Sequence, residues 1–167
     1  MTDTKIKSMA RVGVFAAFAV MLSFLERLLP SPVPVPGIKL GLANIVVIIF
    51  LYRYGVSDAA KVQLLRILLF STLFGGINTA LFSLAGGVLS LAAMIVLQKA
   101  GVFSILGVSI AGGVFHNVGQ IAAAAVVVQN AAMFAYLPLL IITGQVTGLL
   151  TGLVAFLVLS RLSKTPY

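Results

Sequence analysis

The chain has 167 residues, of which 61% are apolar and only 8% are charged. This composition excludes an ordinary soluble domain, which is about half apolar and about a quarter charged, so the bilayer must solvate most of the surface. The formal charge of +8 does not indicate nucleic-acid binding, because the basic residues are scattered between apolar runs and form no stripe.

Apolar stretches of about the length that crosses a bilayer, roughly 20 residues, follow one another along a single transmembrane domain, residues 1–167. In chain order the expected spans are 10–29, 38–54, 59–74, 79–97, 105–128 and 136–159. The proline-rich segment 30–37 ends the first span, because proline lacks the backbone donor that a helix needs. Ser57 or Asp58 is expected to cap the third. The sequence therefore predicts an all-α integral membrane protein, a bundle of six transmembrane helices.

The basic residues favour six spans with both termini in the cytoplasm, because Lys and Arg are enriched in cytoplasmic loops. Span 59–74 is the weakest, with charges in its first half. If it were a surface helix, five spans would remain and Lys99 would fall outside. With six spans, Arg27 and Lys39 are the basic residues that fall on the outer side. The expected location is a plasma membrane of bacterial type. The nine cytoplasmic basic residues are then Lys5, Lys7, Arg11, Arg53, Lys61, Arg66, Lys99, Arg161 and Lys164.

Small residues at helical spacing indicate close contacts between membrane helices. Two such stripes are expected to pack inside the bundle: Gly144, Gly148 and Gly152 on the last span, and Ser83, Gly87 and Ser90 on the fourth. A third stripe on the first span fits internal packing and partner docking equally well: Gly13, Ala16, Ala17 and Ala19.

Polar side chains within the spans must face the bundle interior or a cavity, because lipid offers no hydrogen-bond partners. His116 and Gln120 are four residues apart and share a helix face, with Asn117 at its edge. Further candidate contacts to a solute are Arg27, Lys39, Asn44, Asn78 and Gln145. Lys39 could meet an anionic group at a helix start. We expect a polar cavity in the outer half of the bundle, with segment 30–37 as its lid.

Each candidate also has a structural alternative. His116 could hydrogen-bond a neighbouring helix, and Asn44 and Asn78 could cap helices. Glu26 and Arg27 could form an interfacial ion pair of little energetic weight.

The chemistry of common enzymes is absent from the sequence. There is no Walker A motif, so this chain does not hydrolyse ATP itself. Asp3, Glu26 and Asp58 are too far apart along the chain to form a two-metal site or an acid–base pair. One histidine and no cysteine disfavour a zinc site. We expect no enzyme activity, no metal and no cofactor.

Four segments resemble the conserved blocks of a known family. Segment 36–46, PGIKLGLANIV, resembles the signature of the Gx transporter family, also labelled heptaprenyl diphosphate synthase component I. Segments 82–91, 113–120 and 148–152 resemble its later blocks. The family is in turn similar to the S components of energy-coupling factor (ECF) transporters.

The resemblance implies a subunit that binds a vitamin-like solute from outside and works with a transmembrane coupling subunit and two ATPases. It assigns docking to the small residues of the first span, Gly13, Ala16, Ala17 and Ala19. The implied solute is a flavin or an isoprenoid- or quinone-related compound. The alternative is a non-catalytic membrane component associated with heptaprenyl diphosphate synthesis, since the chain lacks the paired aspartate motifs of catalytic prenyl synthases. An autonomous secondary carrier also remains, although the chain has few charges for ion coupling.

Overall fold

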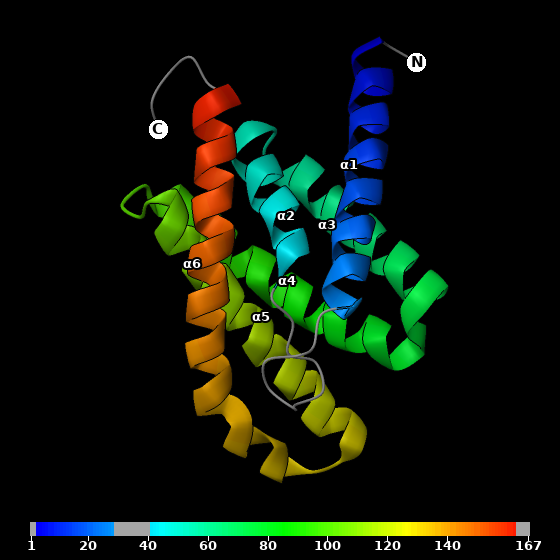
Figure 1. Cartoon of the computed structure of the whole chain (residues 1–167), viewed down its shortest axis with the longest axis vertical. Coiled ribbons are helices and arrows are strands. Elements are labelled where there is room, and N and C mark those ends of the chain that lie inside the picture. Colours follow the sequence, from blue (N-terminus) through cyan, green and yellow to red (C-terminus); the bar gives the residue numbers. More distant parts are fainter. Residues whose placement is uncertain (1–2, 29–40, 163–167) are drawn as a thin grey trace.

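The computed structural model describes residues 3–28 and 41–162, and every regular element in these ranges is a helix (Figure 1). The elements are α1 (Asp3–Leu28), α2 (Leu42–Arg53), α3 (Val56–Phe70), the π-helical turn η1 (Ser71–Gly75), α4 (Gly76–Ala100), α5 (Ile105–Val128), the 3-10 turn η2 (Ala131–Tyr136) and α6 (Leu137–Leu162). The all-α prediction is confirmed for the described part of the chain. Helix α1 begins and α6 ends at the same end of the molecule, while η2 lies at the opposite end (Figure 1).

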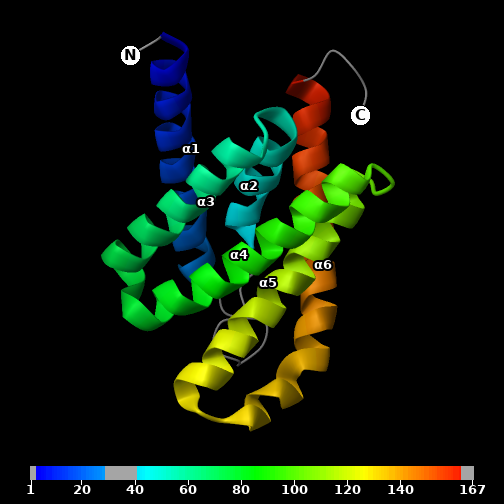
Figure 2. The same cartoon turned by 180° about the vertical axis from the view of Figure 1, so that it is seen from behind.

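Turn chemistry sets the helix ends. Gly76 has a φ of 73°, a left-handed value that favours glycine, and the chain changes direction there between α3 and α4 (Figure 2). Ser104 begins α5, with its hydroxyl oxygen accepting a bond from the Gly107 N–H at 3.3 Å. The expected cap by Ser57 or Asp58 is wrong, because α3 starts after Gly55, with no side-chain capping bond.

Four helical stretches in the described residues are long and apolar enough to cross a membrane: Lys5–Leu28, Val56–Ala100, Ile105–Val128 and Ala131–Leu162. Val56–Ala100 contains α3, η1 and α4, so the chain turns within it. Helix α2 has 12 residues. At 1.5 Å per residue it is about 18 Å long, shorter than the roughly 30 Å hydrocarbon core. These stretches fit a multi-pass membrane protein, and the six-span count stays a prediction.

Glycines hold α4, α5 and α6 in close contact, as predicted for the glycine stripe of α6. A Cβ added to Gly148 would lie 2.7 Å from the Cα of Ile110, and one added to Gly152 would lie 2.7 Å from the Cβ of Ser109. A Cβ on Gly119 would lie 2.6 Å from the carbonyl oxygen of Ala85. The three helices therefore pack backbone against backbone.

Charged side chains join α1 to the start of α3. The Asp58 carboxylate accepts bonds from Arg11 and Lys61, each at 3.0 Å, and from the Ser8 hydroxyl at 3.1 Å. The Arg11 guanidinium also lies 3.8 Å from the centre of the Tyr54 ring. Beside this cluster α2 supplies much of the apolar core, including fully buried Phe50. Helices α1, α2 and α3 thus form a second packing unit, held by charges as well as by apolar contacts.

Candidate functional site

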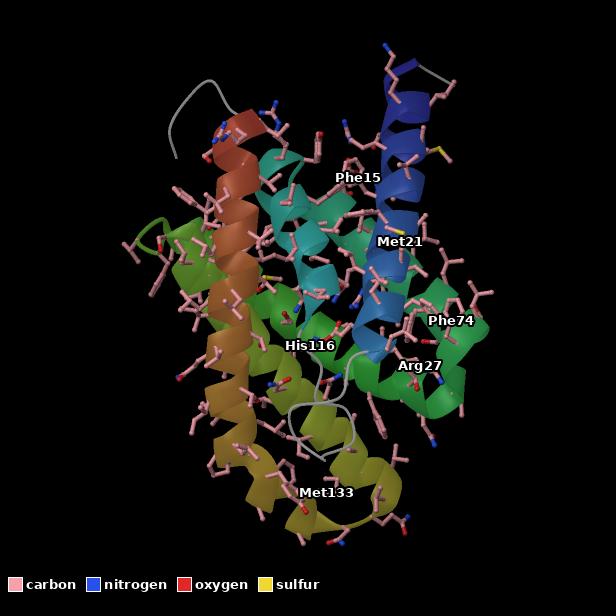
Figure 3. All side chains as sticks on the ribbon, in the orientation of Figure 1. Phe15, Met21, Arg27, Phe74, His116 and Met133 are labelled. Atoms are coloured by element: carbon pink, nitrogen blue, oxygen red, sulfur yellow. The ribbon has the colours of Figure 1, made fainter. Side chains whose placement is uncertain are left out.

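The polar residues predicted on α5 are inside the protein. His116, Asn117 and Gln120 are 7%, 3% and 6% exposed, and Figure 3 places His116 near the middle of the molecule. The Asn117 amide donates a 2.8 Å bond to the carbonyl oxygen of Leu140, which ties α5 to the start of α6. This bond gives Asn117 a structural role, whereas His116 and Gln120 face α4.

A glycine on α4 makes room for these two side chains. A Cβ added to Gly86 would lie 2.7 Å from the His116 carbonyl oxygen, 2.8 Å from the Gln120 Cγ and 3.1 Å from the His116 Cε1. No real Cβ fits at such distances from backbone. The backbone of α4 therefore forms one wall of the His116–Gln120 cluster.

A second polar pair, buried Gln63 and half-buried Arg66, lies on α3, and Gln63 packs against Gly87, the next residue of α4. Gln63 is 2% exposed, and a Cβ on Gly87 would lie 2.5 Å from its Nε2. The Arg66 Nη2 donates a 3.0 Å bond to the Gln63 Oε1, and Nη1 donates a 3.4 Å bond to the Ser23 hydroxyl of α1. The buried Gln63 Nε2 and Arg66 Nε have no hydrogen-bond partner among the described residues.

Glu26 joins the end of α1 to the residue just before α2. Its side chain is buried, at 8% exposure, and Oε1 accepts a 2.6 Å bond from the Gly41 N–H just before α2. The Arg66 guanidinium bonds to Ser23, three residues before Glu26 on α1. Arg66 therefore lies near the last turns of α1, at the opposite end of that helix from Lys5. Its position does not fit the expectation that Arg66 and Lys5 lie at the same membrane face, and which face each one occupies stays a prediction.

Sequence reasoning missed Gln63, Arg66 and Glu26 as site residues. One signal was available, because Gln63 and Arg66 are three apart and share a helix face. The contact from Arg66 to Ser23 joins residues 43 positions apart and leaves no local pattern in the sequence.

The other predicted solute contacts do not join the buried group. Asn78, Gln145 and Arg27 are exposed, and Arg27 donates a bond to the Phe74 carbonyl oxygen, where α1 ends beside η1 (Figure 3). Gln145 follows Gly144, whose face packs on α5, so its own side chain turns outward. Asn44 is half-buried in the first turn of α2. Lys39 and the predicted lid at 30–37 lie outside the described residues.

The small residues of α1 divide between inside and outside. Ala16 and Ala19 have no exposed surface, so they pack within the chain and offer nothing to a partner. Ala17 is exposed, and half-buried Gly13 lines a groove of about 540 Å³ between α1 and α3. Only Gly13 and Ala17 of the predicted docking stripe reach the surface.

Comparison with known proteins identifies the family. The family model of heptaprenyl diphosphate synthase component I matches residues 15–158. The chain belongs to this family. The match covers all the buried polar residues described above, from Ser23 on α1 to Gln120 on α5. No curated protein and no solved structure matches this component I chain. In the described residues no three His, Asp or Glu side chains come together as a metal site.

Proposed function

We propose that this component I chain is a membrane-embedded solute-binding subunit of an ECF-type transporter. The observation that carries the proposal is a group of polar side chains within an otherwise apolar helical chain: buried Gln63, His116 and Gln120, and half-buried Arg66. Polar and ionisable side chains are costly inside a membrane and are retained mainly where they serve a pathway or a ligand.

The arrangement suits a small solute with a polar head and an apolar body. Gln63 and Arg66 supply unused donors on one side of α4, and His116 and Gln120 lie on the other. Gly86 and Gly87 have no side chains, so both pairs of polar residues approach the α4 backbone closely. Flavins and isoprenoid- or quinone-related compounds have this combination of polar and apolar parts.

Energy for transport would come from partners, because the chain has no nucleotide-binding motif. We propose a transmembrane coupling subunit with two ATPases, docked at the exposed part of the α1 stripe around Gly13 and Ala17. Pull-down from native membranes should recover these three kinds of subunit. Recovery of the chain alone at native expression levels would contradict the transport proposal.

The proposal includes six crossings of the plasma membrane with both termini in the cytoplasm. Its support is that α1 begins at the same end of the molecule as α6 ends (Figure 1). Because the chain has no cysteine, single cysteines can report topology without background labelling. Lys7→Cys and Arg161→Cys should both resist an impermeant thiol reagent in intact cells and react after permeabilisation. Opposite behaviour of the two sites would exclude an even number of crossings.

A second function is favoured by the family description itself. The chain could be a non-catalytic membrane component associated with heptaprenyl diphosphate synthesis. This alternative predicts co-purification with a soluble prenyl synthase and altered quinone tails after deletion of the gene. An unchanged quinone tail length and an unchanged amount of quinone in the deletion strain would exclude this second function.

A further inference from the structure

We propose that the groove between α1 and α3 binds an anionic phospholipid, with an acyl chain along its apolar length and the phosphate at its basic end. The inference goes beyond the proposed transport function and does not depend on it. Ala17, the other exposed member of the α1 stripe, does not line this groove, so a coupling subunit still has Ala17 as a docking surface.

The groove is apolar along most of its length. Its volume of about 540 Å³ lies within the range of pockets that hold small molecules, roughly 300–1,000 Å³. Helix α3 lines it from Lys61 to Leu68, about 10 Å of helix at 1.5 Å per residue. Met9 and Leu68 are 64% and 61% exposed, and an acyl chain in the groove would cover part of this surface. The apolar lining residues are Met9, Val12, Gly13, Leu64, Leu65 and Leu68.

Basic side chains gather at one end of the groove, where Ser8 and Lys61 line it. The Lys61 Nζ donates to Asp58 at 3.0 Å, but the side chain is 57% exposed and an ammonium group has three donors. Lys5 is exposed and precedes Ser8 by three residues, so it shares the same face of α1 one turn further out. Arg11 also bonds to Asp58. Among the side chains that the structure describes, three basic groups thus accompany one carboxylate here, which complements an anionic head group.

The basic end lies at the depth where a phospholipid has its phosphate. The stretch Lys5–Leu28 has 24 residues, about 36 Å of helix, which exceeds the roughly 30 Å hydrocarbon core. When α1 crosses the bilayer, its first turns, with Ser8, lie at the level of the head groups, and the apolar part of the groove lies among the acyl chains. Basic pockets between membrane helices bind anionic head groups. A soluble anion would use only the basic end and a neutral lipid only the apolar length, whereas an anionic phospholipid uses both.

Two kinds of variant separate the apolar and the basic parts of the site. A Cβ added to Gly13 meets no atom of the described residues within 4 Å, so the ring of Gly13→Phe would fill the groove without a clash. Val14→Phe is its matched control, because Val14 is 68% exposed and does not line the groove. Lys5→Gln removes a charge at the basic end. Lys7→Gln removes an exposed charge from another face of α1 and controls for net charge.

The test uses the full chain in detergent, titrated with phosphatidylglycerol or with phosphatidylcholine of the same acyl chains, and native mass spectrometry to count bound lipids. The wild type should bind its first phosphatidylglycerol roughly tenfold more tightly than phosphatidylcholine. Lys5→Gln and Lys61→Gln should each weaken phosphatidylglycerol binding about fivefold, the effect of one basic side chain near an anionic lipid surface, and leave phosphatidylcholine binding unchanged. Gly13→Phe should abolish the tight phosphatidylglycerol adduct, whereas Val14→Phe and Lys7→Gln should keep it.

Equal affinities for the two lipids, or an unchanged phosphatidylglycerol adduct in Gly13→Phe, would overturn the inference. Glycerol phosphate, the soluble part of the head group, should not displace the lipid at matched concentration. Displacement would assign the basic end to a free anion and would also overturn the inference, as would loss of the lipid when a coupling subunit is added. All these outcomes leave the proposed transport function standing, because that function depends on recovery of a solute and a coupling subunit.

Discussion

Helices α4–α6 and helices α1–α3 are held together by different means. In the first group, glycines bring backbones into contact, as at Gly148 against Ile110. In the second, charged side chains cross between helices, as at Arg11 and Asp58. In lipid, burying one apolar side chain against another stabilises little, so close backbone packing supplies the van der Waals contacts that hold these helices together. The Arg11 side chain is 33% exposed, so this ion pair keeps part of its contact with water.

The two groups meet where α2 packs on α6 and where α3 packs on α4 at Gly87. Gly87 lies against Gln63 from the charged group, and Gly86 lies against His116 and Gln120 from the glycine group. The candidate site is therefore at the boundary between a unit fixed by backbone packing and a unit fixed by polar side chains. Substitutions in each unit should have different consequences.

The largest effect is expected from Gly148→Ala in the glycine group. The new Cβ would lie 2.7 Å from the Ile110 Cα and the Ser109 carbonyl oxygen, and backbone atoms cannot move aside cheaply. We expect a loss of about 3 kcal/mol of stability, or no folded protein. The measurement is thermal or denaturant unfolding in detergent.

Gly13→Ala on α1 is the matched control, because a Cβ there meets no atom of the described residues within 4 Å. Alanine favours a helix over glycine by up to about 1 kcal/mol, so this variant should be neutral or more stable. Equal destabilisation by the two variants would refute the backbone-contact account of α4–α6.

A smaller loss is expected from Asp58→Asn in the charged group. The change removes the ion pairs with Arg11 and Lys61 but keeps an oxygen for the Ser8 hydroxyl. The Lys61 side chain is 57% exposed, so water compensates part of the loss, and we expect about 2 kcal/mol. Lys61→Gln should cost less than Asp58→Asn in the same unfolding assay. The reverse order would mean that Asp58 does not organise the junction between α1 and α3.

The smallest loss is expected from Asn117→Ala, which deletes the bond to the Leu140 carbonyl oxygen. Hydrogen bonds between membrane helices contribute about 1 kcal/mol. The free energy of unfolding should fall by that amount. Solute binding should be retained, because the Asn117 amide bonds to Leu140 of α6 and not to the solute. The exposed Asn78→Ala serves as the control and should leave stability unchanged. A loss of binding in Asn117→Ala without a loss of stability would place Asn117 among the ligand contacts.

Local sequence patterns predicted the features that depend on helix periodicity. The glycine stripe of α6 and the shared, inward face of His116 and Gln120 both follow from residues three or four apart. The helical fold class follows from the long apolar runs.

Features that depend on distant contacts could not be predicted in this way. Ser57 or Asp58 is predicted to cap a helix, yet Asp58 pairs with Arg11 from another helix, and Arg66 bonds to Ser23 near the end of α1 rather than lying beside the basic residues at its start. Ala16 and Ala19 share the small-residue pattern of the docking stripe, but the packing of α1 against its neighbours buries them. Sequence spacing defines a face of a helix but not what covers that face.

The most direct test of the account is native mass spectrometry of the chain purified from its own membranes. The wild type should carry one small solute per chain, released on activation, and Gln145→Ala should carry it equally, since Gln145 is exposed. The double variant His116→Ala, Gln120→Ala should fold but lose most of the solute, because truncation inside the bundle removes contacts without exposing polar groups to lipid. A wild type without solute, or equal occupancy in the double variant, would contradict the claim that the buried polar group is a binding site.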